Sequence, residues 1–176
     1  MKTNYKIFSI AIFSLLWFNC REKSSPEVDM PVVPEQHSGG ENLGEITYPF
    51  QEDVYVPIYS EIYNKSRGSL FHLTATLSIR NTSLGDTLFV KKVDYYDTNG
   101  TFIRSHLAKP TFVRPLGTLD YVIKERDTLG GSGAKFIISW GANEQIEPIF
   151  QSVMIGTFNQ QAFSFAVDGI TIPPKE

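Results

Sequence analysis

The sequence predicts an all-β fold, an antiparallel β-sandwich of the immunoglobulin-like kind with seven or eight strands. From about Ile46 onward, short segments alternate apolar and polar residues, which is the period of a strand with one buried face. Aromatic residues make up 13% of the chain and are joined by many Val, Ile and Thr, and these types favour strands. Gly, Asn, Asp and Pro separate the segments, and we find no long amphipathic helical pattern, so a sandwich is favoured.

The clearest strand lies in the segment LFHLTATLSIRNTS, from residue 70 to residue 83. Alternate positions place one apolar set on a single face: Phe71, Leu73, Ala75, Leu77 and Ile79. Val54–Tyr59 alternates too, but Pro57 cannot donate to a ladder and predicts a strand at a sheet edge. The remaining predicted strands are Gly117–Lys124, Ala134–Trp140, Pro148–Gly156 and Gln161–Val167.

A tight hairpin is predicted at Asn99-Gly100, within LFVKKVDYYDTNGTFIRS. This dipeptide suits the two positive-φ positions of a type I′ turn. The expected cross-strand pairs are Thr98 with Thr101, Tyr96 with Ile103 and Tyr95 with Arg104. Asp97 is expected to start the turn and to pair diagonally with Arg104 at the surface, where such a pair contributes under about 1 kcal/mol.

The first residues have the pattern of an export signal. Lys2 and Lys6 precede an apolar run of about a dozen residues, as in the positive and apolar regions of a secretory signal. A membrane-spanning helix needs roughly 20 apolar residues to cross about 30 Å of hydrocarbon. We therefore predict that residues 1–19 are a signal peptide.

Cys20, the only cysteine of the chain, follows this run in the sequence WFNC. The context resembles the lipobox of bacterial lipoproteins, whose cysteine is acylated and becomes the mature N-terminus. Trp17, Phe18 and Asn19 stand where that pattern has Leu, a small residue, and Gly, Ala or Ser. Because no disulfide can form within the chain, we predict lipid attachment at Cys20; the alternatives are an ordinary cleaved signal peptide and an uncleaved anchor.

The predicted organisation is a lipidated N-terminus and flexible linker at residues 20–46, then a single β-sandwich domain at residues 47–176. The linker contains Pro26, Pro31 and Pro34 and shows no periodicity. The expected location is the cell envelope, anchored to a membrane through the lipid and facing the periplasm or the cell surface. Loss of Lys2 and Lys6 would take the formal net charge from −3 to about −5, and without a basic block nucleic acid is not expected as a partner.

Five blocks of the sequence resemble one bacterial family of exported, often lipid-anchored proteins, catalogued as domain of unknown function 3124. They are VYVPIYSEIY at 54–63, TLSIRNTS at 76–83, VDYYDTNG at 93–100, GGSGAKFIISW at 130–140 and EPIFQSVMIG at 147–156. The resemblance covers roughly residues 50–172. It implies no activity and no catalytic residues.

The candidate site residues fall into three groups. Aromatic residues with polar tips serve both half-buried cores and recognition surfaces; core or rim packing is favoured, and the alternative is a binding surface at the edge formed by Val54–Tyr59: Tyr55, Tyr59, Tyr63, Tyr95, Tyr96 and Trp140. The loop Gly130, Gly131, Ser132 and Gly133 is a candidate anion site, or a flexible turn. The hairpin with Asp94, Tyr95, Tyr96, Asp97, Asn99 and Gly100 lacks the ligand spacing of a calcium loop, so we predict neither a metal nor a cofactor.

The sequence favours a non-catalytic envelope lipoprotein that binds a protein, a glycan or another envelope component. The alternative is a periplasmic or surface hydrolase acting through Ser132 or through a carboxylate pair. The domain's two histidines, His72 and His106, and the turn acids Asp120, Glu125, Asp127, Glu144 and Glu147 make no complete catalytic set. A purely structural or assembly role is a third hypothesis.

Overall fold

A computed structural model describes residues 47–158 and 161–173. The described residues all belong to one compact unit. The predictions of a signal peptide, of lipid attachment at Cys20 and of a linker at residues 20–46 lie outside the described residues. Within them, no helix is long and apolar enough to cross a membrane.

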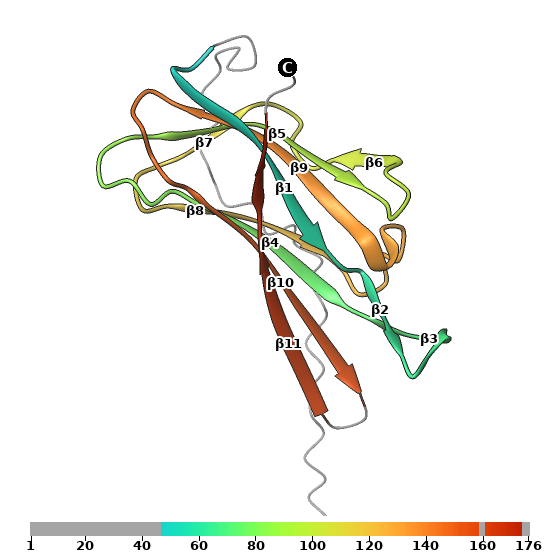
Figure 1. The fold of residues 1–176 in the computed structure, drawn as a ribbon. Coiled ribbons are helices and arrows are strands. Elements are labelled where there is room, and N and C mark those ends of the chain that lie inside the picture. The colour runs from blue at the N-terminus through green and yellow to red at the C-terminus, as the bar shows by residue number, and fades with distance from the viewer. Residues whose placement is uncertain (1–46, 159–160, 174–176) are drawn as a thin grey trace, which may run out of the picture. The chain divides into compact units, whose positions relative to one another are not determined.

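The described residues form two antiparallel sheets that lie face to face (Figure 1). The first has the order β12-β1-β9-β5-β6, with β7 also on β5; the second has the order β11-β10-β4-β8; β2 and β3 make a separate hairpin. The bounds are β1 Phe50–Ile58, β2 Glu61–Asn64, β3 Ser66–His72, β4 Thr74–Arg80, β5 Leu88–Tyr96, β6 Phe102–Ser105, β7 Thr111–Val113, β8 Thr118–Ile123, β9 Ala134–Ala142, β10 Ile149–Phe158, β11 Gln161–Asp168 and β12 Ile170–Ile172, with a 3₁₀ turn, η1, at Gly131–Gly133. The predicted all-β sandwich is confirmed.

Eight of the described strands have six residues or more, and the other four have three or four. The predicted segments correspond to long strands, and Ala134 begins β9 as expected. The segment around Leu73 is divided between two strands. The Leu73 N–H donates to the Ser60 carbonyl at 2.9 Å, so the chain leaves the β2–β3 hairpin there and enters the second sheet as β4.

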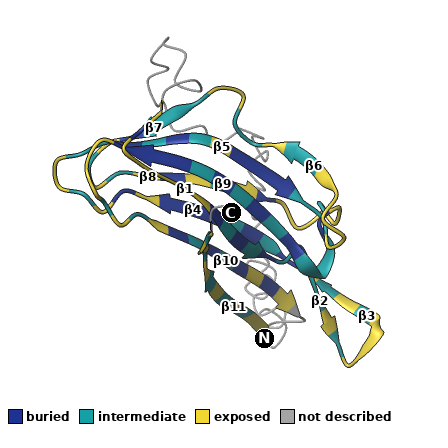
Figure 2. Cartoon of the chain, turned by 45° about the horizontal axis from the view of Figure 1, so that its top comes forward, coloured by how far each residue is buried: buried dark blue, intermediate teal, exposed yellow. Residues whose placement is uncertain are grey.

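The core lies between the inner faces of the two sheets. On β4 it takes Ala75, Leu77 and Ile79, all fully buried, as the alternation predicted. On β9 it takes every second residue from Ala134 to Ala142. Each large apolar side chain buried in this way contributes about 1.5–3 kcal/mol. By contrast, β3 is largely exposed (Figure 2).

Pro57 lies in the half of β1 that has one neighbouring strand. β9 pairs with all nine residues of β1, whereas β12 pairs only with Asp53, Val54 and Tyr55. The edge prediction therefore holds for the half that contains Pro57, but the strand is second from the edge where β12 covers it. Since proline has no N–H, the uncovered half is where it is tolerated.

The hairpin after β5 differs from the predicted type I′ turn. Tyr95 does lie opposite Arg104, but a bulge follows, and Tyr96 lies opposite Phe102. The Gly100 N–H donates to the Asp97 carbonyl at 3.1 Å, and of Asn99 and Gly100 only Gly100 has a positive φ, +83°. The type I′ prediction is wrong because the Asp97 carboxylate accepts the N–H groups of Asn99 at 2.9 Å and Thr101 at 2.7 Å, an Asx-type turn.

Candidate functional site

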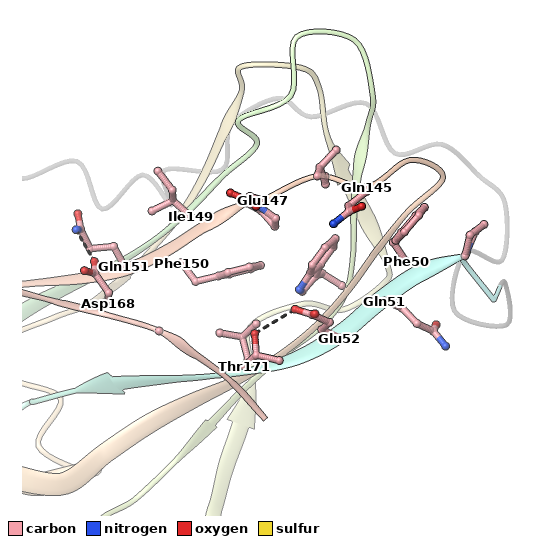
Figure 3. Close-up of a pocket in the computed structure, with 16 residues that line it drawn as sticks. Phe50, Gln51, Glu52, Gln145, Glu147, Ile149, Phe150, Gln151, Asp168 and Thr171 are labelled. Atoms are coloured by element: carbon pink, nitrogen blue, oxygen red, sulfur yellow. Dashed lines mark hydrogen bonds between the residues drawn. The ribbon is translucent and has the colours of Figure 1, made fainter. Parts of the chain in front are cut away.

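An open groove of about 820 Å³ lies at the end of the sandwich where β1 and β10 begin (Figure 3). We call it the end groove. Its walls are residues 49–52 of β1 and its approach, residues 145–148 between β9 and β10, residues 149–151 of β10, and Asp168, Gly169 and Thr171 at the β11–β12 junction, with Val54 and Trp140 from the inner faces. Ligands commonly bind in concave recesses lined by apolar side chains and a few polar groups.

The groove is open because β12 is short. β12 pairs with β1 only as far as Asp53, opposite Ile172, and Pro173 comes next. Since proline has no N–H, it cannot extend the ladder. Among the described residues, Phe50–Glu52 therefore have a strand partner only on the β9 side.

Glu52 carries a charge on the inner face of β1. Inward and outward residues alternate along the strand, so Glu52 follows the same face as Val54 and Val56, which are buried. Its direct partner on β9 is Trp140, and directly opposite residues have Cβ atoms about 5 Å apart. Thr171 donates its hydroxyl to the Glu52 carboxylate at 3.1 Å (Figure 3).

The charged residues of the lining that the structure describes are all acidic. They are the carboxylates of Glu52, Glu147 and Asp168, and no lysine, arginine or histidine is among these described lining residues. Three glutamines add neutral amides: Gln51, Gln145 and Gln151. Gln151 donates to Asp168 at 2.8 Å, and Gln51 accepts from Lys91 at 2.8 Å. The groove therefore disfavours anions and suits neutral or cationic groups.

Trp140 contributes a buried donor without an acceptor. The side chain is 4% exposed and packs on Phe150 at a ring-centroid distance of 6.2 Å. Its indole N–H is buried and has no hydrogen-bond partner among the described residues. Most buried donors are paired, and an unpaired one costs about 1–3 kcal/mol, so Trp140 marks the groove wall as a place that an acceptor would stabilise.

The six aromatic residues considered as a possible binding surface lie in different settings. Tyr95 is fully buried in the core, and Tyr63 is 59% exposed on β2. The others have separate settings: Tyr59 packs edge-on to Phe165, Tyr96 packs on Phe102, Tyr55 faces outward from β1, and Trp140 lines the end groove. Sequence reasoning missed Glu52, Gln145, Glu147 and Asp168 as lining residues.

The loop Gly130–Gly133 is part of a packed corner. The Gly130 carbonyl accepts the Thr98 N–H at 2.9 Å and the Thr98 hydroxyl at 3.0 Å. The amides expected to face an anion are used inside the protein, since Gly131 donates to Thr128 at 3.2 Å and Gly133 donates to Thr98 at 2.9 Å. This arrangement argues against the anion site. It also explains the glycines, because the loop lies so close to β5 and its turn that a Cβ atom would meet Tyr95 or Thr98.

His106 lies near this corner within an aromatic cluster. Its ring is 5.4 to 6.0 Å from those of Tyr95, Tyr121 and Phe136. Burial, followed by the positive charge of Arg104, lowers the pKa of His106 from 6.5 to about 4. Arg104 donates to His106 at 3.2 Å and pairs with Asp127, so the predicted pair of Arg104 with Asp97 is wrong.

These contacts do not assemble a set of catalytic side chains for the hydrolase alternative. Neither histidine in the described part of the chain is bonded to Ser132, because His106 accepts from Arg104 and His72 lies 3.7 Å from Glu61. In the hairpin from Asp94 to Gly100, for which no metal was predicted, Asp94 pairs with Lys92 at 3.0 Å while Asp97 accepts backbone amides. Among the described residues, no three His, Cys, Asp or Glu side chains are grouped as metal ligands.

Comparison with known proteins places the chain in a family. Among the curated proteins nothing matches. A solved structure described as the crystal structure of Thermotoga maritima 1070 aligns with 68% of this chain and 92% of its own, at 13% identity and a TM-score of 0.39, a likeness too slight to carry an argument. The family model described as protein of unknown function (DUF3124) matches residues 51–172, in agreement with the resemblance of the sequence blocks. The chain therefore belongs to the DUF3124 family.

Proposed function

We propose that this protein is a membrane-anchored lipoprotein of the cell envelope whose sandwich domain binds a ligand in the end groove without transforming it. The observation that carries the binding role is the buried indole N–H of Trp140, which has no hydrogen-bond partner in the described part of the chain and lies in a groove wall with carboxylates and amides. A ligand with acceptor groups and no negative charge would satisfy both features.

The anchor is supported by the short apolar run at residues 7–18, by Cys20 directly after it, and by the lack of a second cysteine. The test is Cys20→Ser in the full chain, followed by fractionation of membrane and soluble material. We expect the variant to leave the membrane fraction, because serine at position 20 cannot receive the acyl chains whose burial would hold the protein at the membrane. A variant that stays membrane-bound through its first residues would contradict the anchor.

Ligand binding has a built-in reporter. The chain has two tryptophans, Trp17 and Trp140, so Trp17→Phe in the full chain leaves only the indole in the groove wall. We would titrate this protein with a neutral N-acetylglucosamine oligomer, a lysine-rich peptide and a glutamate-rich peptide. We expect a saturable change of fluorescence with a neutral or cationic probe and none with the anionic one.

The specificity control uses charge reversal at two ends of the sandwich. Glu52→Lys alters the groove, whereas Glu125→Lys alters an exposed residue just beyond the end of β8 that lies away from the groove. The binding signal should be lost in the first variant and kept in the second. If neither the neutral nor the cationic probe gives a saturable signal, or if the signal survives Glu52→Lys, the proposed function is wrong.

A further inference from the structure

The uncovered edge of β1 narrows the class of ligand. We infer that the end groove receives an extended, basic peptide segment that adds as a strand to β1 at Phe50–Glu52. The inference rests on the proposed function, since it names what the groove binds. Two independent features of the described residues carry it: a strand edge along one wall that β12 does not cover, and lining side chains whose only charges are negative.

The strand edge supplies backbone hydrogen bonds. Successive residues of an antiparallel strand direct their N–H and C=O groups to opposite sides. Of Phe50, Gln51 and Glu52, at least one therefore presents both groups on the side that β12 leaves uncovered. A peptide in the extended conformation satisfies such groups by strand addition. A saccharide has no equivalent row of alternating donors and acceptors.

The carboxylates select the side chains of that peptide. Glu147 is exposed in the loop before β10, and Asp168 is exposed at the end of β11; with Glu52 they place negative charge on three different segments of the wall. Lysine or arginine side chains of the ligand would form charge-assisted hydrogen bonds with them, about twice as strong as neutral ones.

Apolar residues of the lining suit the methylene stems of those basic side chains. Phe50 is 38% exposed and Ile149 is 42% exposed, and both belong to the wall. Phe50 lies on the same face of β1 as Glu52, so a lysine or arginine side chain that reaches the Glu52 carboxylate can pack its stem against the Phe50 ring. The Trp140 N–H is covered in the free protein, so a peptide carbonyl reaches it only when a neighbouring side chain of the rim moves.

The test compares three capped hexapeptides on the full chain that carries Trp17→Phe. The first alternates valine and lysine, the second replaces each lysine by glutamate, and the third keeps the lysines but is N-methylated at its valines. We expect saturable binding of the first alone. Methylation should weaken it by at least about tenfold, because it removes the donors of the added strand.

Variants then assign the binding to the groove. Glu52→Gln and Glu147→Gln should each weaken binding of the lysine peptide by about tenfold, whereas Glu125→Gln, beyond the end of β8 that lies away from the groove, should leave the affinity unchanged. Equal binding of the methylated and unmethylated peptides, or no binding of the lysine peptide, would overturn strand addition. If the N-acetylglucosamine oligomer binds in place of the peptide, this inference fails while the proposed binding function stands.

Discussion

The packed corner at Gly130 gives a prediction whose size follows from distances. A Cβ atom added at Gly130 would lie 1.9 Å from the Tyr95 hydroxyl oxygen, 2.8 Å from Tyr95 Cζ and 2.7 Å from Ala134 Cβ. Overpacking of this kind costs typically 1–3 kcal/mol and sometimes more. We expect Gly130→Ala to lower the free energy of unfolding by about 3 kcal/mol, because Tyr95 is fully buried and has little room to move.

Tyr95→Phe should stabilise the protein, in contrast to Gly130→Ala. Its hydroxyl is buried without a hydrogen-bond partner among the described residues, and burial raises its pKa, so it stays neutral near pH 7. Removing an unsatisfied buried hydroxyl should raise the free energy of unfolding by about 1 kcal/mol. In the double variant the closest clash disappears while those with Tyr95 Cζ and Ala134 remain, so we expect a favourable coupling of about 1–2 kcal/mol.

Urea unfolding followed by circular dichroism measures all four proteins of this cycle, with Tyr96→Phe as a matched control on the same strand. If Tyr95→Phe lowers the free energy of unfolding by more than about 1 kcal/mol, the Tyr95 hydroxyl has a hydrogen-bond partner. The candidate for that partner is the nearby Ser60 side chain. Additivity within about 0.5 kcal/mol would refute the stated clash.

Two further predictions concern the same end of the fold. The folded-state pKa of His106, about 4, lies below its ordinary 6.5, so its contribution to stability is complete above pH 6.5 and is lost as pH falls from 6.5 to about 4. Because the ring is partly exposed, the loss should be only about 1–2 kcal/mol, and His106→Gln should flatten this part of a stability–pH curve; an unchanged slope would contradict the assignment. Thr98→Val removes the hydroxyl that joins Gly130 and Gly133 and should cost about 1–2 kcal/mol in urea unfolding, and a neutral result would mean that the corner is held by other contacts.

The fold was predictable where its signal is local. Alternation along Ala134–Trp140 marked a long strand of the first sheet, and alternation from Leu73 to Ile79 marked the core face of β4, because strand period and burial are written in neighbouring residues. The strands β7 and β12, with three residues each, are too short to show any period. The predicted turn type was wrong for a different reason: the Asp97 carboxylate accepts hydrogen bonds from two backbone amides and so determines the turn.

The end groove depends on long-range pairing, and this explains why only Trp140 was singled out in advance. Glu52 is unusual in the local sequence pattern, because its charge lies on the strand face on which Val54 and Val56 are buried. The position of Glu52 becomes informative only when β12 is known to leave Phe50–Glu52 unpaired on its side. This depends on β12 ending at Ile172 before Pro173, more than a hundred residues later. Strand length, and not a motif, therefore creates the groove. It follows that replacing Pro173 alone should not close it, since Pro174 comes next and also lacks an N–H.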